Sequence, residues 1–264
     1  MPITVAVTGA TGKMAKEVMA AVVRDPGLAL AGTVSRSASG QSLEAPWGGS
    51  VPLAPDIAGL LALVKPDVLV DFTNAGYAMP LLRTAIAAGV RPVIGTSGVT
   101  DEQVAELAAL CRQHGVGGVF AANFALGGVV MMHLAAVAAR YFDNAEIIEM
   151  HHDQKADAPS GTAIATAQMM AAARGQAFRH PPTHKETLPH GRGAELEGIA
   201  LHSMRITGAL AHQEVVFGAL GQTLHIRHNA MSRECYMPGV VIAIKAAMER
   251  KDLAVGLETV LGLS

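Results

Sequence analysis

Hydrophobic residues occur in short, nearly continuous runs over the first 122 residues of the chain. Five of these runs predict buried parallel strands, at residues 3–8, 28–35, 67–72, 91–94 and 118–121. Helical patterns lie between them: Met14, Val18 and Val22 recur at a spacing of four, and residues 100–103 have the form of a capping box. Alternating strands and helices predict a Rossmann-like, doubly wound α/β domain.

The pattern changes near Asn123. A helix is expected at 128–141, a strand at 146–150 and a helix at 163–170. Runs at 199–205, 213–217 and 223–228 alternate in polarity and predict antiparallel strands with one buried face. The polar, Pro- and Gly-rich segment 174–198 is expected to be a long loop, and the tail 238–262 helical.

These elements indicate two domains. Residues 1–122 and 233–264 would form a dinucleotide-binding domain. Residues 123–232 would form an α+β domain with a largely antiparallel sheet, for substrate binding and oligomerisation.

Composition narrows the classes of function. The chain has 264 residues, half of them hydrophobic, and a net charge of −2, so a broad basic surface for nucleic acid or anionic lipid is not expected. No apolar run is long enough to span a membrane, and the first residues do not read as a signal peptide. Cys111 and Cys235 are far apart, which argues against a disulfide framework or a zinc site and favours a cytoplasmic protein.

A glycine-rich turn follows the first predicted strand and opens the first predicted helix. It reads Gly9-Ala10-Thr11-Gly12-Lys13-Met14-Ala15. This is a variant of the dinucleotide fingerprint, in which Gly9 permits a tight turn and Gly12 lets a pyrophosphate approach the backbone. The alternative is a glycine turn that only packs strand against helix.

The second strand ends without the carboxylate that would bind the ribose 2′-hydroxyl of NAD. Ser35 and Arg36 stand there instead. Arg36 would pair with a 2′-phosphate, so NADPH is the expected cofactor, with NADH also accepted. The alternative is that Arg36 stacks on adenine or is solvated.

The next three strands end in polar or glycine-containing segments. Because the carboxyl ends of parallel strands share one edge of the sheet, these segments should line the ligand-binding edge. They are Asp71-Phe72-Thr73, Gly95-Thr96-Ser97-Gly98 and Ala121-Ala122-Asn123-Phe124.

The densest set of reactive side chains lies between the strand at 146–150 and the following helix. It reads His151-His152-Asp153-Gln154-Lys155-Ala156-Asp157-Ala158-Pro159-Ser160-Gly161-Thr162. A histidine exchanges protons near neutral pH, and Lys155 supplies a positive charge or a second proton. Pro159 suits a helix start and Ser160 or Thr162 can cap it, so free N–H groups there would hold an anion.

The segment HHDQKADAPSGTA resembles the signature of the dihydrodipicolinate reductase family. The similarity covers nearly the whole chain and includes the glycine turn, the motifs DFT, GTSG and AANF, and a late stretch ending at Ser232-Arg233. It implies reduction of a cyclic, imine-bearing dicarboxylate, dihydrodipicolinate, to tetrahydrodipicolinate in diaminopimelate and lysine biosynthesis. It also implies a homotetramer.

The resemblance implies roles for individual residues. His151 would be the catalytic acid/base and Lys155 the second proton donor, while His152, Gly161 and Thr162, with Ser160 at the helix start, would hold the carboxylates. The motifs named above and Arg233 would contact the cofactor. The chain departs from the family at two positions: Lys13 stands where many members have arginine, and Ser35 where members that accept NADH often have an acid.

Several alternatives have to be weighed. A related amine or imine dehydrogenase on the same scaffold would act on a substrate with one carboxylate, and a non-catalytic nucleotide sensor would not need His151 or Lys155. A hydrolase using Ser160 and Lys155 ignores the dinucleotide motifs. His151 and His152 as metal ligands lack a third ligand at helical spacing. No metal site is therefore expected.

Overall fold

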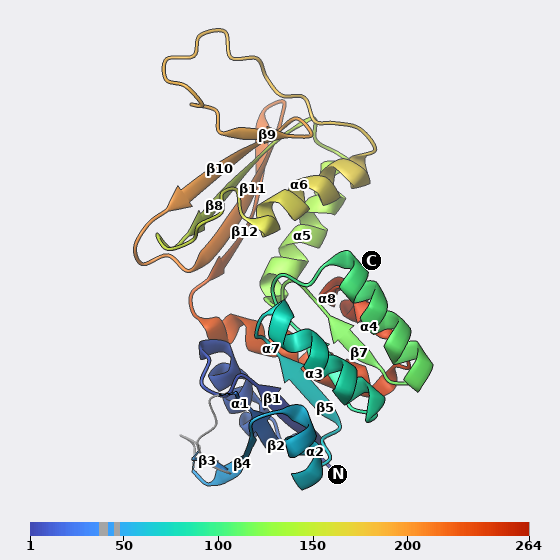
Figure 1. Cartoon of the computed structure of the whole chain (residues 1–264). Coiled ribbons are helices and arrows are strands. Elements are labelled where there is room, and N and C mark those ends of the chain that lie inside the picture. Colours follow the sequence, from blue (N-terminus) through green and yellow to red (C-terminus); the bar gives the residue numbers. More distant parts are fainter. Residues whose placement is uncertain (37–41, 45–47, 264) are drawn as a thin grey trace. The chain divides into compact units, whose positions relative to one another are not determined.

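The computed structural model describes residues 1–36, 42–44 and 48–263. The chain divides into two compact units, Met1–Phe124 with Tyr236–Ser264, and Ala125–Cys235 (Figure 1). The sequence pattern places these divisions at 122/123 and 232/233.

An eight-stranded sheet forms the centre of the first unit, in the order β13-β7-β6-β5-β1-β2-β4-β3. Its strand pairs are parallel except for β3 with β4. The strands are β1 Ile3–Thr8, β2 Leu28–Val34, β3 Ser42–Glu44, β4 Ser50–Ala54, β5 Val68–Asp71, β6 Arg91–Ile94, β7 Gly118–Phe120 and β13 Leu253–Val255. The five predicted strands are all present, so the predicted Rossmann-like sheet is confirmed.

The sequence pattern does not predict β3, β4 or β13. Strand β13 interrupts the tail that is expected to be helical throughout 238–262, and it pairs with β7. The expectation of a continuous helical tail is therefore wrong. Periodicity cannot identify a strand of this length, because two or three residues fit a helix equally well.

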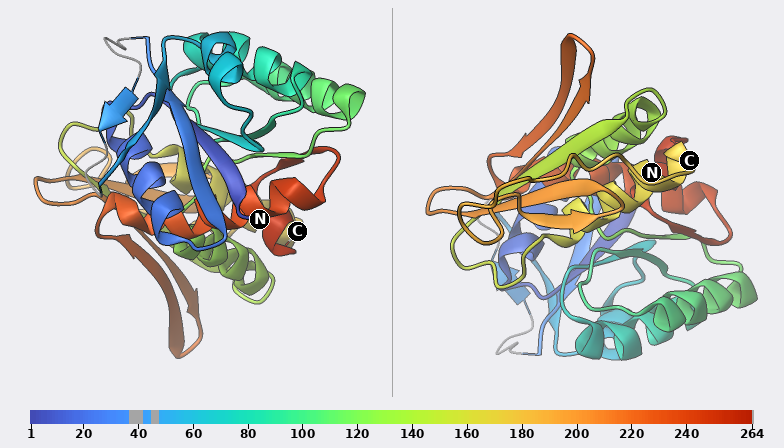
Figure 2. Two further views of the ribbon diagram at one scale, coloured as in Figure 1. Left: turned by 90° about the horizontal axis from the view of Figure 1, so that it is seen from below. Right: turned by 90° about the horizontal axis from the view of Figure 1, so that it is seen from above.

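Helices cover both faces of this sheet. They are α1 Lys13–Arg24, α2 Ile57–Leu63, α3 Ala75–Ala87, α4 Asp101–His114, α7 Met237–Glu249 and α8 Leu257–Leu261. Helices α2, α3 and α4 pack on one face, while α1 and α7 contact the central strands from the other (Figure 2). Helix α4 begins at the predicted capping box, in which Thr100 and Gln103 bond reciprocally.

The second unit is a five-stranded sheet in the order β12-β11-β8-β10-β9, with two helices on one face. Its strands are β8 Asn144–His151, β9 Ala194–Leu196, β10 Ile199–Arg205, β11 Ala211–Ala219 and β12 Gln222–Ala230. The helices are α5 Leu126–Ala139 and α6 Gly161–Arg174; a 3-10 helix, Arg233–Tyr236, precedes α7. Ile147, Val215 and Phe217 are fully buried beneath the two helices.

Two features of this sheet correct the sequence-based expectation. Strand β10 runs parallel to β8, although the other three pairs are antiparallel. The expected buried face of β12 is covered only in part: Leu224 is 38% exposed, Ile226 and His228 are half-buried, and Ala230 is buried. β12 is an edge strand, and β11 is its one neighbour in the sheet. Among the described residues, no helix is both long and apolar enough to cross a membrane.

Candidate active site

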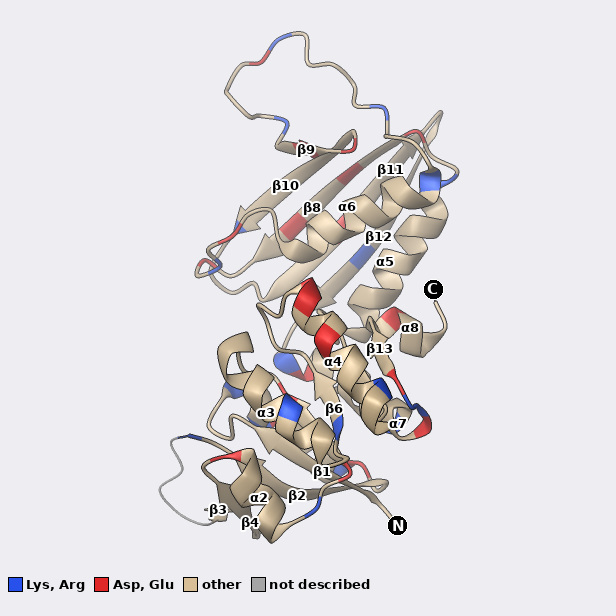
Figure 3. Cartoon of the chain, turned by 45° about the vertical axis from the view of Figure 1, so that its right-hand side comes forward, with Lys and Arg blue, Asp and Glu red and all other residues tan. Residues whose placement is uncertain are grey.

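A buried carboxylate lies at the end of β8, two residues before the signature segment. Because side chains alternate along a strand, Ile147, Glu149 and His151 share the face that α5 and α6 cover. Glu149 is fully buried, although the neighbouring positions on this face are apolar. Figure 3 shows how few charged residues the covering helices carry, with Arg174 as the single Lys, Arg, Asp or Glu of α5 and α6.

Hydrogen-bond donors from β8, β10 and the start of α6 surround Glu149. Arg205 at the end of β10 donates from both terminal nitrogens, at 2.9 Å to Oε2 and 2.8 Å to Oε1. The N–H of Ser160 donates to Oε1 at 3.1 Å, and His151 Nδ1 lies 2.6 Å from Oε2. Burial by itself would raise the pKa of Glu149, but the hydrogen bonds from Arg205, Ser203 and His151 outweigh it and lower the pKa. Glu149 is therefore a carboxylate near neutral pH.

This carboxylate orients the ring of His151. An ionised carboxylate only accepts hydrogen bonds, so Nδ1 must carry the proton and Nε2 is left for a ligand. Burial lowers the pKa of His151, and the nearby charges of Lys155 and Arg205 act in the same direction, against the opposing effect of Glu149. His151 is thus neutral at pH 7 in the absence of a ligand.

Helix α6 begins directly beside this pair. Ser160 is its N-cap, with Oγ accepting from the N–H of Ala163 at 3.1 Å. In the described part of the chain, the N–H groups of Gly161 and Thr162 donate to no protein acceptor. Two free N–H groups at the positive end of a helix dipole form a site for an anion. Both groups of Ser160 are already used within the protein, so a direct contact of Ser160 with substrate stays a prediction.

A second chain of hydrogen bonds holds this first turn from β11. Gln213, which pairs with Glu149 across the strands, donates from Nε2 to Thr166 Oγ1 at 2.8 Å. Thr166 in turn donates to the carbonyl of Thr162 at 2.7 Å. The start of α6 is therefore held by hydrogen bonds from two strands, β8 through Glu149 and β11 through Gln213.

Two further candidates for binding a substrate carboxylate, Lys155 and His152, lie on the loop between β8 and α6. Lys155 is 21% exposed, and its Nζ lies 2.7 and 2.8 Å from the carboxylate oxygens of Asp157. The carbonyl of Asp157 accepts from Arg205 at 2.7 Å, which anchors the loop to β10. His152 follows His151 and is half-buried. Lys155 and Arg205 are thus both paired with carboxylates in this structure, Asp157 and Glu149 respectively.

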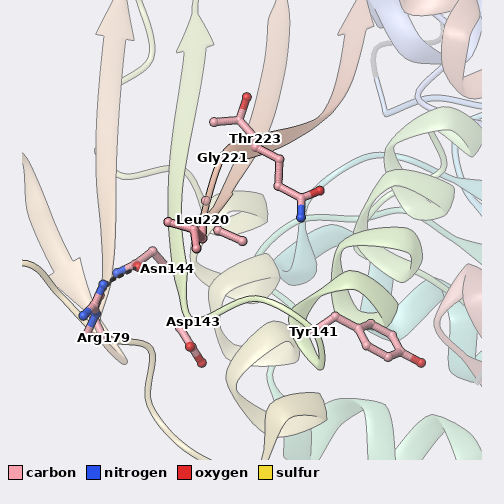
Figure 4. A pocket seen from close by; sticks show the side chains of 10 residues that line it. Tyr141, Asp143, Asn144, Arg179, Leu220, Gly221 and Thr223 are labelled. Atoms are coloured by element: carbon pink, nitrogen blue, oxygen red, sulfur yellow. Dashed lines mark hydrogen bonds between the residues drawn. The ribbon is translucent and has the colours of Figure 1, made fainter.

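A cavity of about 840 Å³ lies elsewhere in this unit, at the β11–β12 hairpin. Figure 4 shows Tyr141, Leu220 and the bonded pair Asn144 and Arg179 around it. Asn144 begins β8 and His151 ends it, so about 20 Å of strand separates this cavity from His151. It contains no histidine or lysine, and we do not assign the chemistry to it.

In the first unit, the strand order reverses between β1 and β5, which is where such sheets bind dinucleotides. The predicted glycine turn lies there: Gly9 has φ +69°, which favours glycine, and Ala15 is buried against the sheet. Helix α1 has no side-chain cap at Gly12, so its first N–H groups are free of side-chain acceptors. An uncapped helix start after a tight turn fits a pyrophosphate.

The segments after β5, β6 and β7 meet at the same edge. Asp71, fully buried, accepts from the hydroxyls of Thr8 at 2.5 Å and Thr73 at 2.8 Å, and from Thr96. Beside them, Phe72 stacks edge-on against Phe124 at 5.2 Å between ring centres. Any side chain at Gly95 would overlap the Phe72 ring, which explains this glycine.

The basic side chain after β2 does not extend freely into solvent. The Arg36 guanidinium lies 4.5 Å from the centre of the Tyr77 ring, near the start of α3, whereas Ser35 is buried. The other predicted cofactor residues lie in the glycine turn, after β6 and β7, and in the 3-10 helix: Ala10, Thr11, Lys13 and Met14; Ser97; Ala121, Ala122 and Asn123; and Arg233. Arg233 belongs to the second unit and the others to the first.

The sequence-based assignment misses Glu149 and Arg205, and it places Asp71 at the ligand-binding edge without giving it a role. A signal for Glu149 exists, because an acid on the apolar face of a predicted strand needs a partner. Arg205 gives no such signal, since its contact with Glu149 spans 56 positions. Asp71 falls in the DFT motif, but only the fold shows its donors. Among the described residues, no three His, Cys, Asp or Glu side chains are placed to share a metal ion.

Comparison with known proteins identifies the family. The models described as "Dihydrodipicolinate reductase, N-terminus" and "Dihydrodipicolinate reductase, C-terminus" match residues 3–124 and 127–261. The 4-hydroxy-tetrahydrodipicolinate reductase of Dehalococcoides mccartyi is 49% identical over 263 residues and covers 99% of both chains. That of Moorella thermoacetica is 46% identical and covers 98% of both.

Solved structures agree. The dipicolinate-bound dihydrodipicolinate reductase from Paenisporosarcina sp. has a TM-score of 0.88 at 40% identity, over 98% of this chain and 99% of that chain. An amine dehydrogenase from Mycobacterium smegmatis, at 17% identity, a TM-score of 0.69 and coverage of 98% and 96%, shares the fold only. The chain therefore belongs to the dihydrodipicolinate reductase family of NAD(P)H-dependent oxidoreductases.

Proposed function

We propose that the chain reduces 4-hydroxy-tetrahydrodipicolinate to tetrahydrodipicolinate, with release of water, in diaminopimelate and lysine biosynthesis. The observation that carries the proposal is the placement of His151, held by Glu149, beside the free N–H groups of Gly161 and Thr162. A proton donor next to an anion site suits a ring whose carboxylate adjoins the carbon to be protonated. The relative from Paenisporosarcina sp. was solved with dipicolinate, an aromatic analogue of such a ring.

The residues divide the chemistry as follows. Loss of the ring hydroxyl as water gives a conjugated imine, to which a bound nicotinamide cofactor would supply a hydride. His151, with Nδ1 held by Glu149, delivers a proton from Nε2 to the electron-rich product of that addition. His151 is neutral in the empty site. The negative charge of a substrate carboxylate bound nearby would raise the pKa of His151, so that it takes up the proton that it delivers. Lys155 can leave Asp157 for the second carboxylate, acting as its counter-ion and as a second proton donor.

The direct test is turnover. The product of dihydrodipicolinate synthase would be supplied in a coupled reaction, and loss of NADPH or NADH absorbance followed. We expect consumption that depends on both the chain and the coupled substrate. No turnover with either cofactor would refute the proposed function.

The carboxylate site can be tested separately with pyridine-2,6-dicarboxylate as a competitive inhibitor. Thr162→Val removes a hydroxyl at the start of α6 and should weaken inhibition by about 1–3 kcal/mol, the usual effect of losing a hydrogen bond to a charged group. Thr223→Val, at an exposed position of β12, is the matched control and should leave the inhibition constant unchanged. Equal inhibition of the Thr162 variant and wild type would show that the Thr162 hydroxyl does not bind the inhibitor's carboxylates.

For the cofactor, we propose a preference for NADPH, with NADH also used. The preference should be modest, because one exposed charge pair contributes about 1 kcal/mol and salt screens it. Arg36→Ala should raise the KM for NADPH and so reduce the ratio of kcat/KM with NADPH to kcat/KM with NADH. Ser35→Glu should shift the cofactor preference toward NADH. Arg83→Ala, an exposed arginine paired with Glu106, is the control. A wild-type preference for NADH would contradict this proposal.

Two further expectations stay predictions: assembly into a homotetramer, which the family resemblance implies, and a cytoplasmic location. The second is consistent with two free cysteines, one buried and one half-buried.

A further inference from the structure

Asp71 is a buried charge that the proposed mechanism does not use. It is 0% exposed, and in the described part of the chain no lysine or arginine pairs with it. Burying a carboxylate without a cation is costly, so it is kept only where hydrogen bonds satisfy it.

The hydrogen bonds of Asp71 are all donated to it. Thr8 at the end of β1 donates to Oδ2 at 2.5 Å, and Thr96 beyond β6 donates to Oδ1. Thr73 donates to Oδ1 from its N–H at 2.9 Å and from its hydroxyl at 2.8 Å. The carboxylate is thus surrounded by neutral donors, and among the described residues none of these donors carries a positive charge.

The position of this charge relative to a dinucleotide follows from the sheet. Asp71 ends β5 and bonds to the end of β1, so it lies at the point where the strand order reverses. In such folds the pyrophosphate crosses this point, and the adenosine half lies toward the strand that follows β1 and α1, here β2. The nicotinamide half therefore extends toward β5 and β6, on the side where Asp71, Thr73 and Thr96 lie.

We propose that Asp71 is an electrostatic positioning residue that favours the oxidised, positively charged nicotinamide over the reduced one. The inference rests on the cofactor site proposed above. When a hydride leaves the dihydronicotinamide ring with its electron pair, the substrate gains that hydride and the ring gains one positive charge. A fixed negative charge nearby stabilises the ring after transfer and also in the transition state, where part of the charge has developed.

The test is the ratio of dissociation constants for NADP⁺ and NADPH, measured on the full chain by fluorescence and calorimetry. Asp71→Asn removes the charge and should raise the ratio Kd(NADP⁺)/Kd(NADPH) by at least about 3-fold, since a buried charge is weakly screened. Thr8→Val is the matched control, because it removes one donor to Asp71 but keeps the charge, and its ratio should equal that of wild type.

A purely structural role for Asp71 would move both constants together. An unchanged ratio in Asp71→Asn would therefore overturn the inference, even if both affinities fall. Should Asp71→Asn fail to fold, Asp71→Ser carries the same test, since its hydroxyl can accept from the Thr73 N–H without a charge. If wild type binds neither nucleotide, the proposed cofactor site fails, and this inference with it.

Discussion

Replacing His151 with glutamine should lower kcat about 100-fold or more, while the KM for substrate changes far less. Glutamine keeps a polar group near Glu149 but cannot deliver a proton, and general acid catalysis contributes on the order of 10²–10⁴ in rate. Lys155→Ala should affect kcat and KM together, because it removes a counter-ion as well as a proton donor. Both variants are measured in the coupled reaction with saturating cofactor.

The matched control for His151 is His202→Gln. His202 lies on β10, bonded to the half-exposed Glu146 at 2.8 Å, and has no contact with Glu149 among the described bonds. Its variant should keep the wild-type kcat. A His151 variant with near-normal kcat would remove His151 from the role of proton donor.

Replacing Glu149 with glutamine should reduce the stability of the fold and the activity together. It leaves the Arg205 guanidinium, 19% exposed, without its partner, and breaking such a buried pair costs about 3 kcal/mol. Glu146→Gln is the control on the same strand, because Glu146 is 42% exposed and pairs with Arg192 and His202. Its loss should cost less than about 1 kcal/mol. Urea unfolding measures the free energy of unfolding of both variants. An equal loss of stability in the two would contradict the role given to Glu149.

The pH dependence gives this prediction a second readout. The pKa of Glu149 is lowered in the folded state, so its contribution to stability is present above the ordinary glutamate pKa of 4.5 and is lost as the pH falls through the lower, folded pKa. The Glu149 variant should lack that decline. Glu149 also raises the pKa of His151, so removing it should shift the loss of kcat/KM at rising pH to lower pH. An unshifted profile would show that Glu149 does not control the proton on His151.

The sequence alone was enough to predict the elements whose pattern is local. The strands of the Rossmann-like sheet, the capping box at Thr100 and the glycine turn at Gly9 depend on residues a few positions apart, and the structure has each of them. The same holds for the strand-to-helix connection that carries His151 and Lys155 and ends in a helix capped by Ser160.

What the tertiary structure decided is which distant side chains satisfy these local groups. Arg205 pairs with Glu149 only because β10 lies beside β8 and runs parallel to it, a neighbour and direction that the alternating pattern mispredicts. The pairing of β13 with β7 likewise depends on strand order. So do the hydrogen-bond donors that reach Asp71 from the ends of β1 and β6. Strand order follows from packing between segments far apart in the chain, and residue periodicity carries no information about it.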